Sequence, residues 1–180
     1  MKATGIVRRI DELGRVVIPK EIRRTMRIRE GEMLEIFTDG DGGVIFKKYS
    51  PIGEVGRFTS EYAEAINRTS GIPVAVCDLD NVVAVAGLPK RDYVNKPISS
   101  PVSMLLKKRS GFTAAAATDS IRLTQNGDGD VSFLLPITSD GSVIGGIMSL
   151  KKSFDNMPDD TEKKLIQTGA TFLSTQMQVD

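Results

Sequence analysis

The fold of the amino-terminal part is decided by the stretch Thr4-Gly5-Ile6-Val7-Arg8-Arg9-Ile10-Asp11-Glu12-Leu13-Gly14-Arg15-Val16-Val17-Ile18-Pro19-Lys20-Glu21-Ile22-Arg23-Arg24. Side chains alternate over residues 5–10, and residues 15–18 are largely β-branched, so both segments are predicted to be strands. Gly14 can adopt the positive φ of a tight loop between them. Pro19 lacks an N–H and suits the first turn of a helix, which is expected to run to about Met26. The stretch therefore predicts a strand–turn–strand–helix unit.

The same stretch is strongly basic. Residues 2–29 hold nine Lys or Arg and three acidic residues, an excess of six positive charges, whereas the net charge of the whole chain is +1. Such an asymmetry indicates a surface that binds a polyanion, most simply double-stranded DNA. The alternative is a solvated face whose cations pair with Glu12, Glu21 and Glu30.

A hairpin is predicted to complete the first fifty residues. Residues 33–37 and 44–47 are rich in apolar side chains, and Asp39-Gly40-Asp41-Gly42-Gly43 joins them. A unit of this size buries only a small fraction of its surface. Association with a second chain would complete its core and would cover its open strand edges.

Residues 3–50 resemble the DNA-binding domain of the AbrB-type transition-state regulators. The resemblance is carried by Thr4-Gly5-Ile6-Val7-Arg8, Asp11-Glu12-Leu13-Gly14-Arg15-Val16-Val17-Ile18-Pro19, Glu21-Ile22-Arg23-Arg24-Thr25, Leu34-Glu35-Ile36 and Lys47-Lys48-Tyr49. It implies a swapped-hairpin fold, in which two chains interlace their hairpins into one small barrel. It also implies DNA contacts, by position in the motif, from Arg8, Arg15, Arg23 and Arg24, with Arg9 and Lys2 as accessories. A related module occurs in antitoxins, so an antitoxin-type regulator stays open as an alternative.

The composition argues against an enzyme. The chain has no histidine, which removes the commonest general base and the commonest metal ligand, and we expect neither a metal nor a cofactor. Its one cysteine, Cys77, cannot form an internal disulfide, and a buried inert thiol is expected. No run approaches the length of a membrane span, and no signal segment opens the chain. These features predict a cytoplasmic, nucleoid-associated protein without a membrane partner.

Charge also divides the chain. Residues 1–50 carry eleven basic and eight acidic side chains, whereas residues 51–180 carry thirteen and fifteen. The junction at Ser50-Pro51-Ile52-Gly53 contains residues that break regular structure. We therefore expect a DNA-binding domain at 1–50, a linker at 51–55 and a second domain at 56–180.

The second domain is predicted to be α+β, with an antiparallel sheet flanked by helices. Ser99 or Ser100 can cap the middle helix, and Asp159 with Glu162 can form a capping box for the last one. The predicted helices are 54–69, 101–109 and 159–177; the predicted strands are 72–77, 82–86, 112–117, 121–125, 131–137 and 142–150; residues 90–100 are expected to form a loop. This order resembles a GAF domain, a small sensory fold.

An AbrB-like start followed by a GAF-like remainder resembles a family of sporulation regulators. The resemblance implies a transcription factor that activates and represses genes in the developing spore. It also implies a homotetramer, in which the swapped hairpins pair two chains and the helices flanking the GAF domains pair the dimers. From spacing alone, the apolar stripes of 54–69 and 159–177 fit either a cover over their own sheet or an intersubunit bundle.

The GAF-like domain raises the question of an unidentified small-molecule effector. Lys90, Arg91, Asp92 and Tyr93 follow the second strand and are candidate pocket residues, although a solvated loop would show the same pattern. Gly145-Gly146 would let a ligand approach closely, or would mark a strand bulge. A ligand-sensing signalling module without DNA affinity is the alternative function. The operator and the sign of regulation at each gene do not follow from the sequence.

Overall fold

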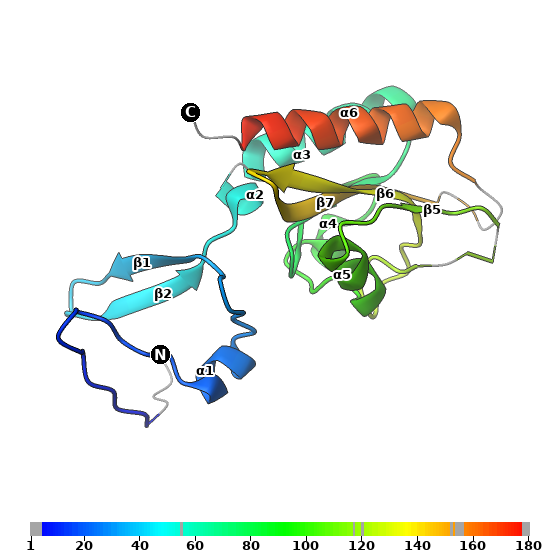
Figure 1. The fold of residues 1–180 in the computed structure, drawn as a ribbon. Coiled ribbons are helices and arrows are strands. Elements are labelled where there is room, and N and C mark those ends of the chain that lie inside the picture. The colour runs from blue at the N-terminus through cyan, green and yellow to red at the C-terminus, as the bar shows by residue number, and fades with distance from the viewer. Residues whose placement is uncertain are drawn as a thin grey trace. The chain divides into compact units, whose positions relative to one another are not determined.

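The computed structural model describes residues 5–54, 56–116, 118, 119, 121–151, 153 and 157–177. The chain divides into two compact units, residues 1–49 and 50–180 (Figure 1). Each unit has its own sheet, and the strands of both sheets pair antiparallel.

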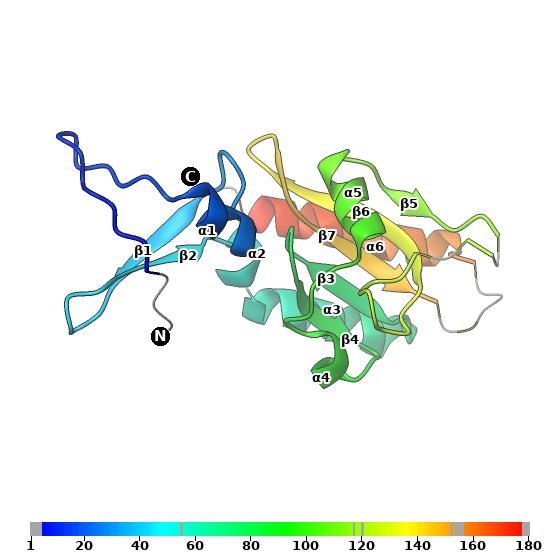
Figure 2. The ribbon, with the colours of Figure 1, turned by 90° about the horizontal axis from the view of Figure 1, so that it is seen from below.

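The smaller unit contains helix α1 (Lys20–Thr25) and a hairpin of β1 (Leu34–Thr38) and β2 (Val44–Lys48) (Figure 2). The two strands pair with Ile36 opposite Phe46. The carboxylate of Asp39 holds the turn, because it accepts hydrogen bonds from the amides of Gly43 (2.5 Å) and Asp41 (3.2 Å). The predicted helix and hairpin are therefore confirmed.

The strands expected at 5–10 and 15–18 are not formed in the described chain. Backbone bonds join the two segments at their shared turn, where Asp11 N donates to Arg15 O (3.0 Å) and Gly14 N donates to Asp11 O (2.9 Å). Most of their apolar side chains are exposed, with Val7 at 87% and Val17 at 71%, whereas Ile18 is half-buried. β-Propensity reflects packing on a sheet face, so without burial in the same chain it does not produce a ladder.

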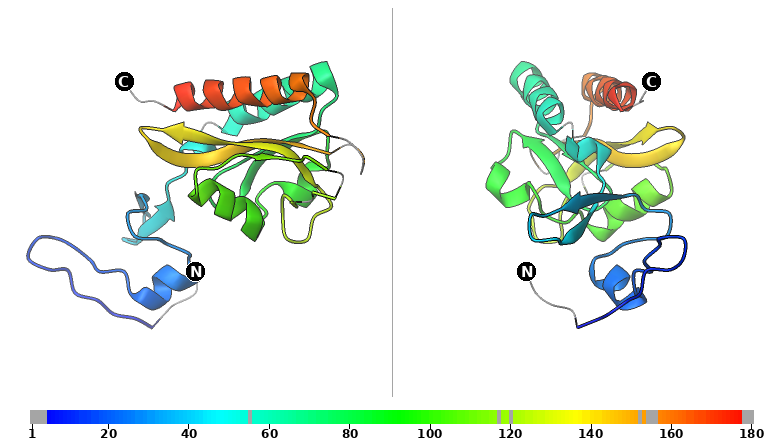
Figure 3. Two further views of the ribbon diagram at one scale, coloured as in Figure 1. Left: turned by 45° about the vertical axis from the view of Figure 1, so that its right-hand side comes forward. Right: turned by 90° about the vertical axis from the view of Figure 1, so that its left-hand side faces the viewer.

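The larger unit is built on a five-stranded sheet of order β4-β3-β7-β6-β5. Two long helices, α3 and α6, cover one face of the sheet, and α4 and α5 lie on the other face (Figure 3). The bounds are β3 (Val74–Cys77), β4 (Val82–Ala86), β5 (Phe112–Thr113), β6 (Val131–Ser139), β7 (Ser142–Leu150), α3 (Gly56–Ser70), α4 (Lys90–Tyr93), α5 (Ser100–Lys107) and α6 (Asp160–Gln176).

A hydrophobic core fills each side of this sheet. Ile166 and Leu173 of α6 are buried in the first core, and Val102 and Leu106 of α5 are buried in the second. The expected α+β architecture with helices flanking an antiparallel sheet is therefore confirmed.

Several predicted boundaries differ from the structure. Residues 51–54, expected to belong to a linker, form helix α2 (Pro51–Glu54), and Ile52 is fully buried in the first core. Residues 90–93 form α4 rather than a loop. The strand expected at 112–117 stops at Thr113, and 121–125 makes isolated bridges instead of a strand.

A side chain explains the early end of β5. The carboxylate of Asp119 accepts hydrogen bonds from the amides of Ala115 (2.8 Å) and Ala116 (3.0 Å), which closes a local turn. Amides bonded in this way are not available to a neighbouring strand. Ala117, the last residue of the expected strand, lies outside the described residues.

The predicted helix caps are partly confirmed. Ser99 caps α5 by accepting from Val102 N (3.3 Å), and Asp159 caps α6 by accepting from Glu162 N (2.7 Å). The predicted capping box is wrong, because Glu162 is 4% exposed and its carboxylate accepts a hydrogen bond from the Ser149 hydroxyl of β7 (2.6 Å). Glu162 therefore ties α6 to the sheet.

Candidate nucleic-acid interface

The turn before the second basic segment is organised around Asp11. One oxygen of its carboxylate accepts hydrogen bonds from the amides of Leu13 (3.0 Å) and Arg15 (2.8 Å), and the other accepts from Arg15 Nε (2.8 Å). The main-chain and side-chain hydrogen bonds from Arg15 lower the pKa of Asp11. The contact uses only Nε of the guanidinium, so it orients Arg15 without engaging its two Nη groups.

Three further predicted contacts, Lys2, Arg8 and Arg9, precede the Asp11 turn in the chain. Arg8 and Arg9 are exposed on the extended segment 5–10. Lys2 lies outside the described residues. The structure therefore shows Arg8 and Arg9 as accessible side chains on a segment that its own chain does not pair.

Helix α1 presents the next two arginines. Arg23 and Arg24 are exposed in its last turn, where positive charge interacts favourably with the helix dipole. The helix ends at Arg27, which adopts a φ of 54° and donates its amide to Arg24 O (3.2 Å), while Ile28 N donates to Arg23 O (2.7 Å). This is the Schellman arrangement of a helix end. The last carbonyls of α1 are thus hydrogen-bonded by the backbone, and Arg23 and Arg24 lie at a helix end of fixed conformation.

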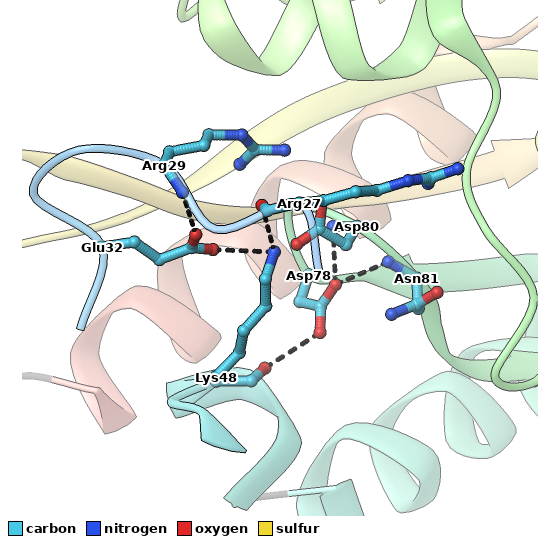
Figure 4. A network of polar contacts seen from close by, with 8 residues as sticks. Arg27, Arg29, Glu32, Lys48, Asp78, Asp80 and Asn81 are labelled. Atoms are coloured by element: carbon cyan, nitrogen blue, oxygen red, sulfur yellow. Dashed lines mark hydrogen bonds and ion pairs between the residues drawn. The ribbon is translucent and has the colours of Figure 1, made fainter. Parts of the chain in front are cut away.

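A polar network fixes the segment after α1 (Figure 4). Lys48 Nζ of β2 contacts the Glu32 carboxylate (3.0 Å) and the carbonyl of Arg27 (2.8 Å), and Arg29 N donates to Glu32 (2.7 Å). These bonds tie the end of α1 to the hairpin. Lys48 therefore has a structural role, although its charge adds to the basic surface.

Figure 4 also shows polar contacts of the larger unit, around the turn between β3 and β4. One oxygen of the Asp78 carboxylate accepts from the amides of Asp80 (2.7 Å) and Asn81 (2.6 Å), which shapes the turn. The other accepts from the Ser50 hydroxyl (3.1 Å). The first residue of the larger unit is thereby attached to its sheet.

Asp11 is a candidate site residue that sequence reasoning missed, although it stands in the motif that carries the resemblance. Its signal was an aspartate followed three residues later by glycine and four residues later by arginine, since Asp side chains readily accept from amides two to four residues ahead.

The smaller unit also exposes much apolar surface. The exposed large apolar side chains of its described residues are Ile6, Val7, Ile10, Leu13, Val16, Val17, Met26, Met33, Ile36, Val44 and Phe46. Exposed large apolar side chains in this number are more typical of an association surface than of the exterior of a monomer.

The four candidate effector residues do not converge on one site. Lys90 and Arg91 line a cavity of about 360 Å³ together with Val83 and Val85 of β4. Asp92 lines a different cavity of about 230 Å³, with Thr124 and Asn126 among its other lining residues. Lys90 and Arg91 thus line one cavity and Asp92 lines another, so they do not form the single pocket that was predicted.

Tyr93 is buried, and it anchors a glycine-containing loop. Its ring lies so close to Gly127 and Gly129 that a side chain at either position would meet it. Burial, and next the negative charge of Asp128, raises the pKa of Tyr93. The residue is therefore part of the second core and not a free pocket wall.

Lys90 is held by an ion pair. Its Nζ lies 2.5 Å from the Glu64 carboxylate of α3, and this hydrogen bond, followed by the charge of Lys90, lowers the pKa of Glu64. Arg91 Nε lies 3.4 Å from the Asp92 carboxylate. Both cations beside the larger cavity therefore already have acidic neighbours.

Gly145 and Gly146 are explained by packing. A side chain at Gly145 would collide with the carbonyl of Cys77 and with Ile52 Cδ1. The pairing of β6 with β7 shifts register beside Gly145, which confirms the bulge interpretation. Cys77 itself is fully buried, and burial raises its pKa to about 12, as expected for an inert thiol.

Two further properties concern only the part of the chain that the structure describes. Within it, no group of three or more His, Cys, Asp or Glu side chains is placed to hold a metal ion. None of its helices combines the length and the apolar character that crossing a membrane requires.

Comparison with known families gives two matches. Residues 54–178 match the model described as stage V sporulation protein T C-terminal, transcription factor. Residues 7–54 match the model described as antidote-toxin recognition MazE, bacterial antitoxin.

Individual relatives agree with this division. Stage V sporulation protein T of Bacillus subtilis (strain 168) is 49% identical over 180 residues, which cover 99% of both chains. The transition state regulatory protein AbrB of the same organism is 63% identical over 51 residues, covering 28% of this chain and 52% of that protein. Among solved structures, the GAF domain of an Acinetobacter phosphoenolpyruvate-protein phosphotransferase aligns with a TM-score of 0.52 at 11% identity, covering 68% of this chain and 81% of that one. This last likeness confirms the GAF-like fold of the larger unit.

Proposed function

The chain belongs to the stage V sporulation protein T family of transcription factors, and from this premise we propose that it regulates sporulation genes by binding double-stranded DNA through its smaller unit. The contacts are Arg8, Arg15, Arg23 and Arg24, with Arg9 and Lys2 as accessories. The observation that carries the proposal is the Asp11 turn, which orients Arg15 and leaves its Nη groups for DNA. An orienting bond to a carboxylate is of little use to a cation that only solubilises a surface.

The DNA-binding form is a dimer in this proposal. Two observations support the dimer. The smaller unit exposes many apolar side chains, which strands interlaced from a second chain would bury. The same strands would pair with the segments 5–10 and 15–18, which form no strand within their own chain. Dimerisation also doubles each arginine, so that a symmetric basic surface meets the duplex.

The larger unit pairs these dimers into a tetramer. Phe58 of α3 is 53% exposed and Phe172 of α6 is 37% exposed, on the two helices that cover the same sheet face. Tyr62 stacks on Phe172 with 5.2 Å between ring centroids. Both helices bury other apolar residues against their own sheet, so the exposed aromatic residues are the part left for an intersubunit bundle.

The assembly is tested by sedimentation. The double variant Phe58→Ser/Phe172→Ser should yield dimers where the natural chain yields tetramers. Met104→Ser is the matched control, because Met104 is also 53% exposed but lies on α5 at the opposite sheet face. A natural chain that sediments as a monomer would remove both assembly proposals.

DNA binding is tested with duplexes selected by the protein from random sequence. A dimer using four arginines per chain neutralises up to ~8 phosphates, so the slope of log K against log[salt] should be as steep as about −7. A flat salt dependence would contradict the proposal. Copurification of a toxin would instead favour the antitoxin-type regulator, to which the MazE match points.

A second role, effector sensing, is favoured by one observation. The cavity of about 360 Å³ beside β4 is lined by the apolar side chains of Val83 and Val85 and by the cations Lys90 and Arg91. A thermal-shift screen with small metabolites tests it, and Lys90→Ala should remove any shift. No catalytic step is proposed for the chain, and as a regulator of transcription it would act in the cytoplasm at the nucleoid.

A further inference from the structure

Helix α5 ends in three consecutive basic residues, Lys107, Lys108 and Arg109, which we call the α5 tip. All three side chains are exposed. The larger part of the chain, residues 51–180, is net negative, yet residues 93–118 hold these three cations and Lys96 without one acidic residue. The α5 tip is thus a local concentration of positive charge on an otherwise acidic domain.

The backbone at Arg109 does not favour an arginine. Arg109 has a φ of 55° and donates its amide to Leu106 O (3.0 Å), while Ser110 N donates to Leu105 O (3.0 Å). This is the Schellman end of a helix, and its left-handed position is usually occupied by glycine or asparagine. Backbone geometry therefore does not favour an arginine at this exposed position, whereas its charge adds to that of Lys107 and Lys108.

The same arrangement occurs in the smaller unit. There α1 ends at Arg27, with a φ of 54° and the same pair of backbone bonds, directly after the arginines proposed to bind DNA. Each unit therefore closes a helix with an arginine in the left-handed conformation, next to exposed cations of the last turn. The α5 tip repeats the local geometry of the DNA-binding helix.

A solvated helix end would look partly similar, since cations near a carboxyl terminus favour the helix dipole. Lys107, in the last turn, already interacts favourably with the helix dipole. The dipole therefore does not require an arginine in the left-handed conformation at position 109. Among the described residues, no ion pair joins the α5 tip to a carboxylate, in contrast to Lys90 with Glu64 and Arg91 with Asp92. Unpaired cations can exchange small ions for phosphates at low cost.

The α5 tip is also accessible in the proposed assembly. Helix α5 lies on the sheet face opposite α3 and α6, the helices proposed to pair dimers (Figure 3). Tetramer formation through α3 and α6 would leave the α5 tip in solvent.

We propose that the α5 tip is a second DNA contact, which binds the phosphate backbone of duplex that flanks the operator. The contact is independent of base sequence, because it consists of exposed cations on a helix end rather than side chains that reach into a groove. The inference rests on the proposed function, since it requires that the smaller unit first binds its operator.

The test compares full-length chains on two duplexes, one with the selected site alone and one with the same site between long flanks of unrelated sequence. The triple variant Lys107→Ala/Lys108→Ala/Arg109→Gly should bind the short duplex as the natural chain does. On the long duplex its salt slope should be shallower by up to ~2.7 for each chain that contacts a flank, at ~0.9 per lost phosphate contact. Arg122→Ala, which removes an exposed cation elsewhere in the same unit, should leave both slopes unchanged.

Arg109→Gly alone separates function from structure. It relieves the left-handed arginine, so the Tm should rise by about 2–4 °C while affinity for the long duplex falls. If the triple variant has the same salt slope as the natural chain on the long duplex, the inference is overturned. That result is also expected if the α5 tip binds an acidic protein instead of DNA. If the natural chain binds neither duplex, the proposed function itself is refuted.

Discussion

Arg15 donates two hydrogen bonds to the carboxylate of Asp11, one from its main-chain amide and one from Nε, each 2.8 Å long. The pair lies in an exposed turn, so its net contribution to stability is small. Its importance is geometric, because it reduces the freedom of the one arginine that leaves the loop between the two basic segments. A guanidinium restrained before binding would lose less conformational entropy in the proposed contact with DNA.

Replacing Arg15 should abolish operator binding while the chain stays folded and oligomeric. A bidentate contact of arginine with a base is worth about 1–3 kcal/mol, and a symmetric dimer loses two of them. Gel shift with Arg15→Ala measures the loss. Arg15→Lys is the control for charge, since it keeps the cation but not the planar fork, and it should restore nonspecific binding only.

Removing Asp11 should lower specificity more than affinity. Asp11→Ala takes away three hydrogen-bond acceptor contacts of the turn and also one negative charge beside the arginines. The loss of order weakens specific binding, and the added net positive charge strengthens nonspecific binding. The ratio of the two Kd values on selected and random duplexes should therefore fall, and a ratio equal to that of the natural chain would contradict the positioning role.

The Asp11 carboxyl should titrate below the usual range. Its pKa is lowered by the main-chain and then the side-chain hydrogen bond of Arg15, so the stabilising contact is complete above the usual pKa and is lost as the pH falls through the lowered one. Carboxyl NMR shifts follow this directly. In Arg15→Ala the main-chain bond remains, so the pKa should rise only part of the way.

Ile52 should be essential to the larger unit although it lies in the expected linker. It is fully buried, and Ile→Ala in a core costs about 2–5 kcal/mol. Denaturant unfolding of Ile52→Ala should show this loss in the transition of the larger unit. Gly145→Ala should be destabilising at the same place, because its added carbon would collide with Ile52 and with the Cys77 carbonyl. Gly40→Ala, where the added carbon meets nothing, is the control.

The Cys77 thiol should be unreactive in the native chain. Its pKa is raised from 9.0 to about 12 by burial and then by the charge of Asp78, so the folded protein holds the neutral thiol across the physiological range. The raised pKa means that stability is unaffected below about pH 9 and falls as the pH rises toward about 12. Alkylation at neutral pH should require denaturant, and rapid labelling without it would contradict full burial.

Several features could be predicted from the sequence because each depends on neighbouring residues. Pro19 is the N-cap residue of α1 after a β-branched segment, and Asp159 caps α6. The bounds of β6 and β7 lie within two residues of the predicted ones. The basic residues of the smaller unit were recognised by position in a motif, and the motif itself is local. The α+β class followed from the order of these elements.

Which of these residues meet depends on how the elements pack against one another. Glu162 was assigned to a capping box, but a hydroxyl on β7 is its partner, and Tyr93 was assigned to a pocket, but loop 126–129 covers it. Charge, helix caps and most element bounds follow from residues close together in the chain, because hydrogen bonds and periodicity act over a few residues. The strands predicted at 5–10 and 15–18 are not formed, because a ladder also needs a partner strand and burial. Burial and side-chain partners were decided by the tertiary structure, because they depend on contacts between elements that are far apart in the chain.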